Sequence, residues 1–173
     1  HLTKHTANAL ENAIDRRERA KKYLEQYCVT YCRCVQSKIA LNNLESQRED
    51  WTQSYETCGG GSGSKKDLAD IVAAFDSIVA DAKRRVAALG FFLDEIDSVI
   101  ANVQAENPNA ATALTKRYLV IGKAPEWIDI ADDLGYAEAT VKMHHARGLD
   151  LVADILEERN YDSKLYTFLY AKP

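Results

Sequence analysis

A heptad repeat of apolar residues dominates the middle of this sequence. Between residues 68 and 103, apolar side chains recur at alternating steps of four and three, which gives a long helix one continuous apolar face. Additional apolar residues widen this stripe, so we expect the helix to contact more than one partner. The seam consists of Leu68, Val72, Phe75, Val79, Ala82, Val86, Leu89, Leu93, Ile96, Ile100 and Val103, and the widening residues are Ile71, Ile78, Phe92 and Val99.

A second long helix is predicted for residues 6–56. This stretch contains neither Pro nor Gly and is rich in Glu, Lys, Arg, Leu and Ala. The following GGGSGS segment at residues 59–64 predicts a flexible loop. Because two long helices joined by a short loop fold back on each other, we expect an antiparallel hairpin over residues 1–106. The wide apolar stripe further predicts that two hairpins associate as a homodimer.

The basic cluster RRERAKK at residues 16–22 has two interpretations. It could bind nucleic acid or phosphate, but the acidic residues Glu11, Asp15, Glu18 and Glu25 lie among the basic ones. This mixture favours a solvated helix face with internal salt bridges. The formal net charge of the chain is −4, so any contact with nucleic acid has to come from a local basic patch.

The cysteine spacing does not favour a metal site. Cys28, Cys32 and Cys34 lie close together, but a zinc site usually needs paired short spacings joined by a loop, and no matching pair of Cys or His follows. We therefore interpret the cysteines as reduced thiols packed in a helical bundle, and we expect neither a metal nor another cofactor.

No pattern in the sequence indicates an enzyme or a membrane protein. A phosphate-binding loop, a GxSxG motif and paired carboxylates with a pocket-forming pattern are all missing. No stretch approaches the roughly 18 consecutive apolar residues of a membrane span. These features predict a cytoplasmic protein without catalytic activity.

The region after the hairpin is predicted to contain three shorter helices. The NPN motif at residues 107–109 ends the long helix near Glu106, and Asn109 is expected to cap a helix over residues 110–121. The next helix begins near Pro125, which suits a first helical turn, and a last helix runs to about Arg159.

The stretch Trp127–Leu149 has the packing pattern of a helix-turn-helix. Ala131 is small where the two helices would cross, Gly135 suits a turn that needs positive φ, and Val141 would anchor the second helix. Residues 107–159 are therefore predicted to be a DNA-binding domain. The residues expected to pack the motif are Trp127, Ile130, Ala131, Leu134, Gly135 and Val141.

Five segments together resemble a known family over nearly the whole chain. They are KKYLEQY at 21–27, GGGSGSKKDLADIVA at 59–73, KRYL at 116–119, W-x-x-I-A-x-x-L-G-Y at 127–136 and TVKMHHARGL at 140–149. They are similar to the phage-encoded late-gene transcriptional regulators of the RinA/ArpU type. The resemblance implies a helical hairpin followed by a helix-turn-helix like the −35-reading domain of bacterial sigma factors. It also implies action in a host bacterium and contact with its RNA polymerase.

The sequence departs from this family at several positions. Glu138 and Ala139 stand where relatives commonly carry Arg or large polar residues, and the segment Lys123–Glu126 is slightly lengthened. His144 stands where relatives usually have an aliphatic residue. Its imidazole could be buried with a hydrogen-bond partner, or it could turn outward toward phosphate.

The second helix of the predicted motif would place its N-terminal half in the major groove of DNA. There, Lys142 could donate to guanine, Glu138 could accept from cytosine N4, and Met143 could contact a thymine methyl group. Phosphate contacts would position the domain, although each flanking base could instead be an ordinary surface charge. The expected base contacts are Glu138, Ala139, Thr140, Lys142 and Met143, and the expected phosphate contacts are Lys116, Arg117, Lys123 and Arg147.

Together these patterns predict an all-α protein that binds double-stranded DNA, and the family resemblance implies a phage or prophage transcriptional regulator. Two alternatives remain at this point: a protein-interaction adaptor that works through the hairpin, and a DNA-packaging recognition subunit. Residues 160–173 form an aromatic tail with Tyr161, Tyr166, Phe168 and Tyr170. We expect this tail to pack on the domain or on a partner subunit, with stacking on exposed bases as the alternative.

Overall fold

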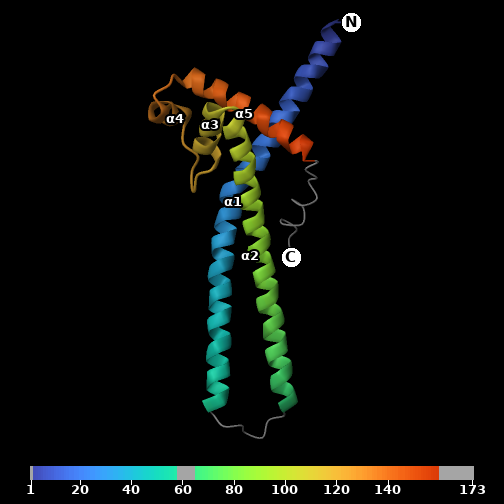
Figure 1. Cartoon of the computed structure of the whole chain (residues 1–173), viewed down its shortest axis with the longest axis vertical. Helices are drawn as coiled ribbons and strands as arrows, with labels where there is room; N and C mark the ends of the chain where they lie inside the picture. The colour runs from blue at the N-terminus through green and yellow to red at the C-terminus, as the bar shows by residue number, and fades with distance from the viewer. Residues whose placement is uncertain (1, 58–64, 160–173) are drawn as a thin grey trace. The chain divides into compact units, whose positions relative to one another are not determined.

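A computed structural model describes the backbone of residues 2–57 and 65–159, and the side chains of residues 11–54 and 70–159. Over these residues the protein is all-α, as predicted, and it has a long N-terminal helix (Figure 1). The loop predicted at 59–64, Cys58 and the aromatic tail lie outside the described residues. The helices are α1 (Leu2–Thr57), α2 (Lys65–Glu106), α3 (Pro108–Tyr118), α4 (Trp127–Leu134) and α5 (Glu138–Glu158). Among the described residues, no helix combines the length and apolarity that crossing a bilayer requires.

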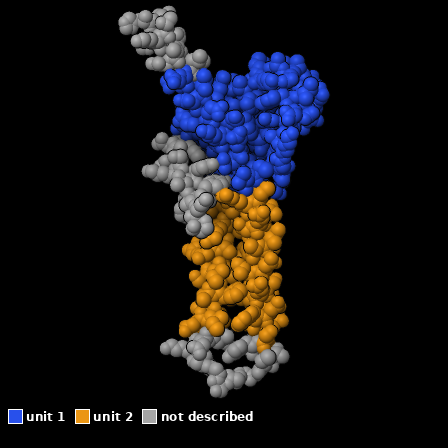
Figure 2. Space-filling view, turned by 180° about the vertical axis from the view of Figure 1, so that it is seen from behind, with its two compact units in different colours: residues 1–31, 92–173 blue, residues 32–91 orange. Residues whose placement is uncertain are grey.

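The chain forms two compact units (Figure 2). Unit 1 comprises residues 1–31 and 92–173, and unit 2 comprises residues 32–91. Helices α1 and α2 therefore contribute to both units. The domain division predicted from the sequence, with boundaries after residues 106 and 159, stays a prediction. Unit 1 contains α3, α4 and α5 together with the first part of α1 and the last part of α2.

The main core of unit 1 is built by α1, α2, α3 and α5. Leu24 of α1, Phe92 of α2 and Leu114 of α3 are fully buried in this core, and Val152 of α5 joins them. The edge of the Tyr23 ring packs on Phe92, with 5.8 Å between ring centroids. Most residues of the stripe in this part of α2 are buried, and only Leu93 is half-buried. The buried ones are Phe92, Ile96, Val99, Ile100 and Val103. The stripe is wide enough for α2 to pack in a core to which three other helices contribute.

Unit 2 has far less buried apolar surface. Among its described residues, the buried apolar side chains are Cys34, Val79 and Leu89. Two ion pairs join its helical segments: Lys83 Nζ lies 2.7 Å from Glu45 Oε1, and Arg48 Nε lies 2.8 Å from Asp76 Oδ1. Each of these four side chains is about 40–60% exposed, so the pairs add little to stability.

Two predicted helix starts are wrong. The cap of α3 is Asn107, whose side-chain oxygen accepts a hydrogen bond from the Ala110 N–H at 3.1 Å, and Asn109 lies inside the helix. Pro108 can occupy the first helical position because the missing N–H of that position has no partner within the helix. Pro125 precedes α4, whose cap is Glu126 in a reciprocal capping box with Asp129.

The end predicted for α3, at residue 121, is also wrong. The helix ends at Tyr118, and Leu119 leaves the helical conformation at φ −89° and ψ 47°. Gly122, which was expected to close the helix, lies three residues beyond Leu119 with φ +104°. The end of α2 at Glu106 and the end of α5 near Arg159 agree with the prediction.

Helices α3 and α5 approach each other closely at Gly148. A Cβ atom added at this position would lie 2.8 Å from Leu114 Cδ1, 2.9 Å from Leu114 Cγ and 3.2 Å from the Ala110 carbonyl oxygen. Glycine is therefore required here by the close packing of the two helices, since the backbone of α5 is ordinary helix at this residue.

We predict that Gly148→Ala destabilises the protein, whereas Gly90→Ala stabilises it. Both glycines lie inside helices, where Ala is intrinsically better by about 1 kcal/mol. A Cβ at Gly90 meets no atom within 4 Å, so this gain is kept. At Gly148 the overpacking costs about 1–3 kcal/mol and offsets or exceeds the gain. Urea unfolding followed by circular dichroism measures both, and equal shifts for the two variants would contradict this account.

Candidate nucleic-acid interface

A tight turn joins α4 to α5. Gly135 ends α4 in the left-handed conformation with φ +67° and ψ 30°, which residues with a side chain rarely adopt. The Tyr136 N–H donates to the Ala131 carbonyl oxygen at 3.0 Å, and the Gly135 N–H donates to the Asp132 carbonyl oxygen at 3.3 Å. Helix α5 starts three residues after Gly135, with Ala137 as its cap residue in extended conformation.

A small apolar cluster, separate from the main core, holds α3, α4 and α5 together. Its buried members are Ala113 of α3, Ile130 and Ala131 of α4, and Val141 of α5, which is fully buried. Trp127 and Leu134 pack against this cluster. The structure thus brings together the five side chains expected to pack the motif, with Gly135 in the turn between the helices.

The first turns of α5 expose most of the predicted base-contacting residues. Ala139, Lys142 and Met143 are exposed, with Met143 at 61%, while Glu138 and Thr140 are half-buried. Lys142 Nζ lies 2.5 Å from Glu138 Oε1, one helical turn away. This ion pair brings a cation and an anion together on the exposed face of the helix.

Three of the predicted phosphate-contacting residues form surface ion pairs. Lys116 pairs with Asp133 of α4, Lys123 Nζ lies 3.5 Å from Glu126 Oε1, and Arg147 Nη2 lies 3.7 Å from Glu106 Oε1. Such exposed pairs are weak, and phosphate can compete for these cations. The Lys123 side chain is 87% exposed and is the most accessible of the three.

Arg117 occupies a different environment. Its guanidinium donates a hydrogen bond to the Pro125 carbonyl oxygen and lies over the Trp127 ring, 4.8 Å from the ring centroid. The group therefore fixes the segment between α3 and α4 through a hydrogen bond and a cation–π contact. A phosphate contact by Arg117 would require both interactions to break.

His145 lies beneath the exposed face of α5. Its Nε2 atom forms a hydrogen bond with the Tyr118 hydroxyl at 2.8 Å, and its ring meets the Trp127 ring edge-on at 4.8 Å. Burial, reinforced by the positive charge of Arg117, lowers the pKa of His145 to about 4. Burial is also the main cause that raises the pKa of Tyr118 to about 12. His144 differs: it is half-buried, with its ring 6.0 Å from that of Tyr136.

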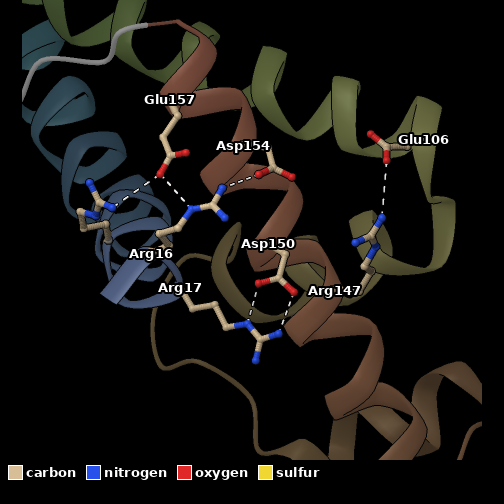
Figure 3. Close-up of polar contacts among 8 residues, drawn as sticks. Arg16, Arg17, Glu106, Arg147, Asp150, Asp154 and Glu157 are labelled. Atoms are coloured by element: carbon tan, nitrogen blue, oxygen red, sulfur yellow. Dashed lines mark hydrogen bonds and ion pairs between the residues drawn. The ribbon is translucent and has the colours of Figure 1, made fainter. Parts of the chain in front are cut away.

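The arginines of the basic cluster bind across to α5, which the sequence interpretation did not foresee (Figure 3). Arg17 forms a two-pronged contact with Asp150, with Nε–Oδ1 at 2.6 Å and Nη2–Oδ2 at 2.7 Å. Arg16 pairs with Asp154 and donates to Glu157 Oε1 at 2.9 Å. The hydrogen bond from Arg17 lowers the pKa of the Asp150 carboxyl group below its ordinary value.

The expectation of local salt bridges holds for a lysine of this cluster. Lys21 Nζ lies 4.0 Å from Glu18 Oε1 and 3.9 Å from Glu25 Oε1 on the same helix. The acidic residues Asp150, Asp154 and Glu157 recur at steps of four and three, so one face of α5 is acidic. That periodicity was the available signal for a long-range partner of the arginines.

These contacts divide α5 into two electrostatically different halves. The C-terminal half carries an acidic row that is neutralised by α1, and the N-terminal half exposes Lys142 and Met143.

Among the side chains that the structure describes, no group of three or more His, Cys, Asp or Glu could hold a metal ion. Cys28, Cys32 and Cys34 are free thiols.

Comparisons with protein-family models, with curated proteins and with solved structures found no match.

We predict that His145 makes stability depend on pH between about 6.5 and 4. The unfolded imidazole binds a proton below its ordinary pKa of 6.5, whereas the folded one stays neutral until about 4. This contribution is therefore present above pH 6.5 and is lost as the pH falls toward 4. In His145→Gln, the unfolding free energy should fall less steeply from pH 7 to pH 4.5 than in the wild type. Parallel pH profiles in urea unfolding would show that His145 does not titrate in this way.

Proposed function

We propose that this protein is a phage or prophage transcriptional regulator that binds double-stranded DNA through α4, the turn at Gly135 and α5. The observation that carries the proposal is the arrangement of α5: Val141 is fully buried against α4, while Lys142 and Met143, the next two residues, are exposed. Such a helix is fixed on its scaffold and presents side chains outward, as a helix that enters the major groove must. The family resemblance of these segments supports the same function.

The ion pair of Glu138 and Lys142 suggests how bases would be contacted. A carboxylate can accept from cytosine N4, and an ammonium group can donate to guanine O6 or N7. These two partners occur together in one G·C base pair or in neighbouring pairs. Glu138 and Lys142, whose charged atoms lie 2.5 Å apart, would therefore give up their contact with each other when DNA binds. In its place the carboxylate would accept from a base donor and the ammonium group would donate to a base acceptor.

Phosphate contacts in this proposal come from Lys116, Lys123 and Arg147. Their exposed ion pairs are of the kind that contributes little, so the cost of exchanging the carboxylate for phosphate is small. Arg117 serves instead to hold the segment before α4. With few phosphate contacts and a net charge of −4, we expect modest affinity for random DNA.

An adaptor function is the alternative, and it is favoured by the exposed apolar side chains of unit 2, such as Trp51 at 63%. The two functions differ in what Lys142 does. In an adaptor, substitution of Lys142 changes no affinity for any DNA, whereas a regulator loses affinity for its preferred site.

We predict that Lys142→Ala weakens binding to the preferred DNA site by about 1–3 kcal/mol and binding to random DNA much less. The preferred site is first selected from fragments of phage genomic DNA, and affinities are then measured by fluorescence anisotropy. Lys38→Ala is the matched control, because it removes the same charge from an exposed position in unit 2.

Three outcomes are distinguishable. A loss confined to the preferred site supports base contact, and equal losses on both DNAs place Lys142 on phosphate. An unchanged affinity for both DNAs, with circular dichroism showing an intact fold, would overturn the proposal in favour of the adaptor.

We predict opposite behaviour for Lys123→Ala and Arg117→Ala. Lys123→Ala should leave thermal stability unchanged and make the dependence of log affinity on log salt shallower by about one. Arg117→Ala should lower the melting temperature, because it removes the hydrogen bond to Pro125 and the contact with Trp127. Melting curves together with binding titrations from 50 to 300 mM salt measure both effects. A shallower salt dependence for Arg117→Ala without destabilisation would place Arg117 on the DNA.

A further inference from the structure

Unit 2 leaves apolar side chains exposed on both of its helical segments. Trp51 of α1 is 63% exposed, and Ile71 and Ile78 of α2 are 48% and 52% exposed. Val72, which belongs to the heptad seam itself, is 41% exposed. The two segments therefore leave part of their apolar surface uncovered, and an additional partner would bury these exposed side chains.

The charges of unit 2 are divided between its two ends. Residues 32–44 and 82–91 contain five basic residues and no acidic residue, and we call this the basic end. The described stretches 45–54 and 70–81 contain six acidic residues and one basic residue, and we call this the acidic end. The ion pairs Glu45–Lys83 and Arg48–Asp76 join the two segments so that like charges of both helices gather at the same end.

We propose that unit 2, through these exposed apolar side chains, binds a second copy of the same chain in antiparallel orientation. In this arrangement the basic end of each copy lies against the acidic end of the other, and a two-fold axis repeats each favourable contact. A parallel pair would place basic ends together and acidic ends together, and like charges repel. The exposed apolar side chains supply the attraction, and the charges select the orientation.

A second copy is favoured over a foreign partner because the surface is complementary to itself. A foreign partner with one sign of charge would match one end of unit 2 and be repelled by the other. The inference does not depend on DNA binding, because association is measured without DNA. Failure of one proposal therefore leaves the other untouched.

The experiment uses the full chain and two charge-reversed variants. The first variant, R84E/R85E, reverses part of the basic end, and the second, E49K/D50K, reverses part of the acidic end. All four side chains are exposed, and none belongs to the ion pairs that join α1 to α2. Sedimentation equilibrium measures self-association, native mass spectrometry identifies mixed dimers, and circular dichroism checks helicity.

The antiparallel arrangement makes three linked predictions. The wild type is a dimer, and each variant alone associates about ten- to a hundredfold more weakly. Both contacts of such a homodimer involve a substituted end, whose net charge falls from five to one in magnitude. An equimolar mixture of the two variants forms mixed dimers. The chain that carries all four substitutions also associates weakly, because the counted charges then leave its basic end at only +1 and its acidic end at only −1.

Other results overturn the proposal. A monomeric wild type at high micromolar concentration shows that unit 2 does not bind its own copy. Homodimers of each variant that are at least as stable as the wild type show a parallel arrangement, in which the substitutions reduce the repulsion between like ends.

The apolar contribution has its own matched test. Trp51→Ser combined with Ile78→Ser should abolish dimers, whereas Ile14→Ser, at an apolar position of unit 1 that is 52% exposed, should retain them. Loss of dimers in Ile14→Ser alone would place the interface outside unit 2.

Discussion

Helix α5 belongs to two apolar clusters at once, and unit 1 depends on this double membership. Near its start, Val141 packs with α4 and α3, while further along Leu149 and Val152 pack in the main core with α1, α2 and α3. Because side chains of the one helix α5 pack in both clusters, α4 is held in a fixed position relative to the main core, although no residue of α4 is part of that core. Gly148 precedes Leu149 in the sequence and packs closely on Ala110 and Leu114 of α3, which belong to the main core.

Local patterns explain what could be predicted from the sequence. The helical class, the long helices and the packing residues around Gly135 follow from periodicity and from the need for positive φ, which are properties of neighbouring residues. The cap of α3 was misassigned because Asn107 and Asn109 both suit a cap, and only Pro108 at the first helical position decides between them. The pairing of the arginines is harder to predict, since Arg17 and Asp150 are 133 residues apart and the acidic periodicity of α5 indicates a basic partner without identifying it. For Arg117, the sequence alone does not distinguish the two roles, because an arginine suits a phosphate contact as well as a contact with Trp127.

The proposed DNA contacts are made by exposed side chains, and the structure explains why the role of an exposed side chain is difficult to predict from sequence. A lysine in a helix can pair with a glutamate one turn away, as Lys142 does, or contact a ligand, and the two uses have the same sequence pattern. Buried groups are more restrictive. His145 is an example, because its imidazole is hydrogen-bonded to the Tyr118 hydroxyl and packed against the Trp127 ring.

The pairing of Arg16 and Arg17 with the acidic row of α5 has a consequence for the exchange of ions with solvent. A carboxylate that comes near DNA without a partner must recruit a cation from solution, and this uptake works against the release of counterions from the phosphates. Asp150 and Asp154 instead pair with guanidinium groups of the same chain. In the proposed complex with DNA, a protein with a net charge of −4 would therefore contact the polyanion through one end of α5, while the acidic row at the other end would already have its counterions.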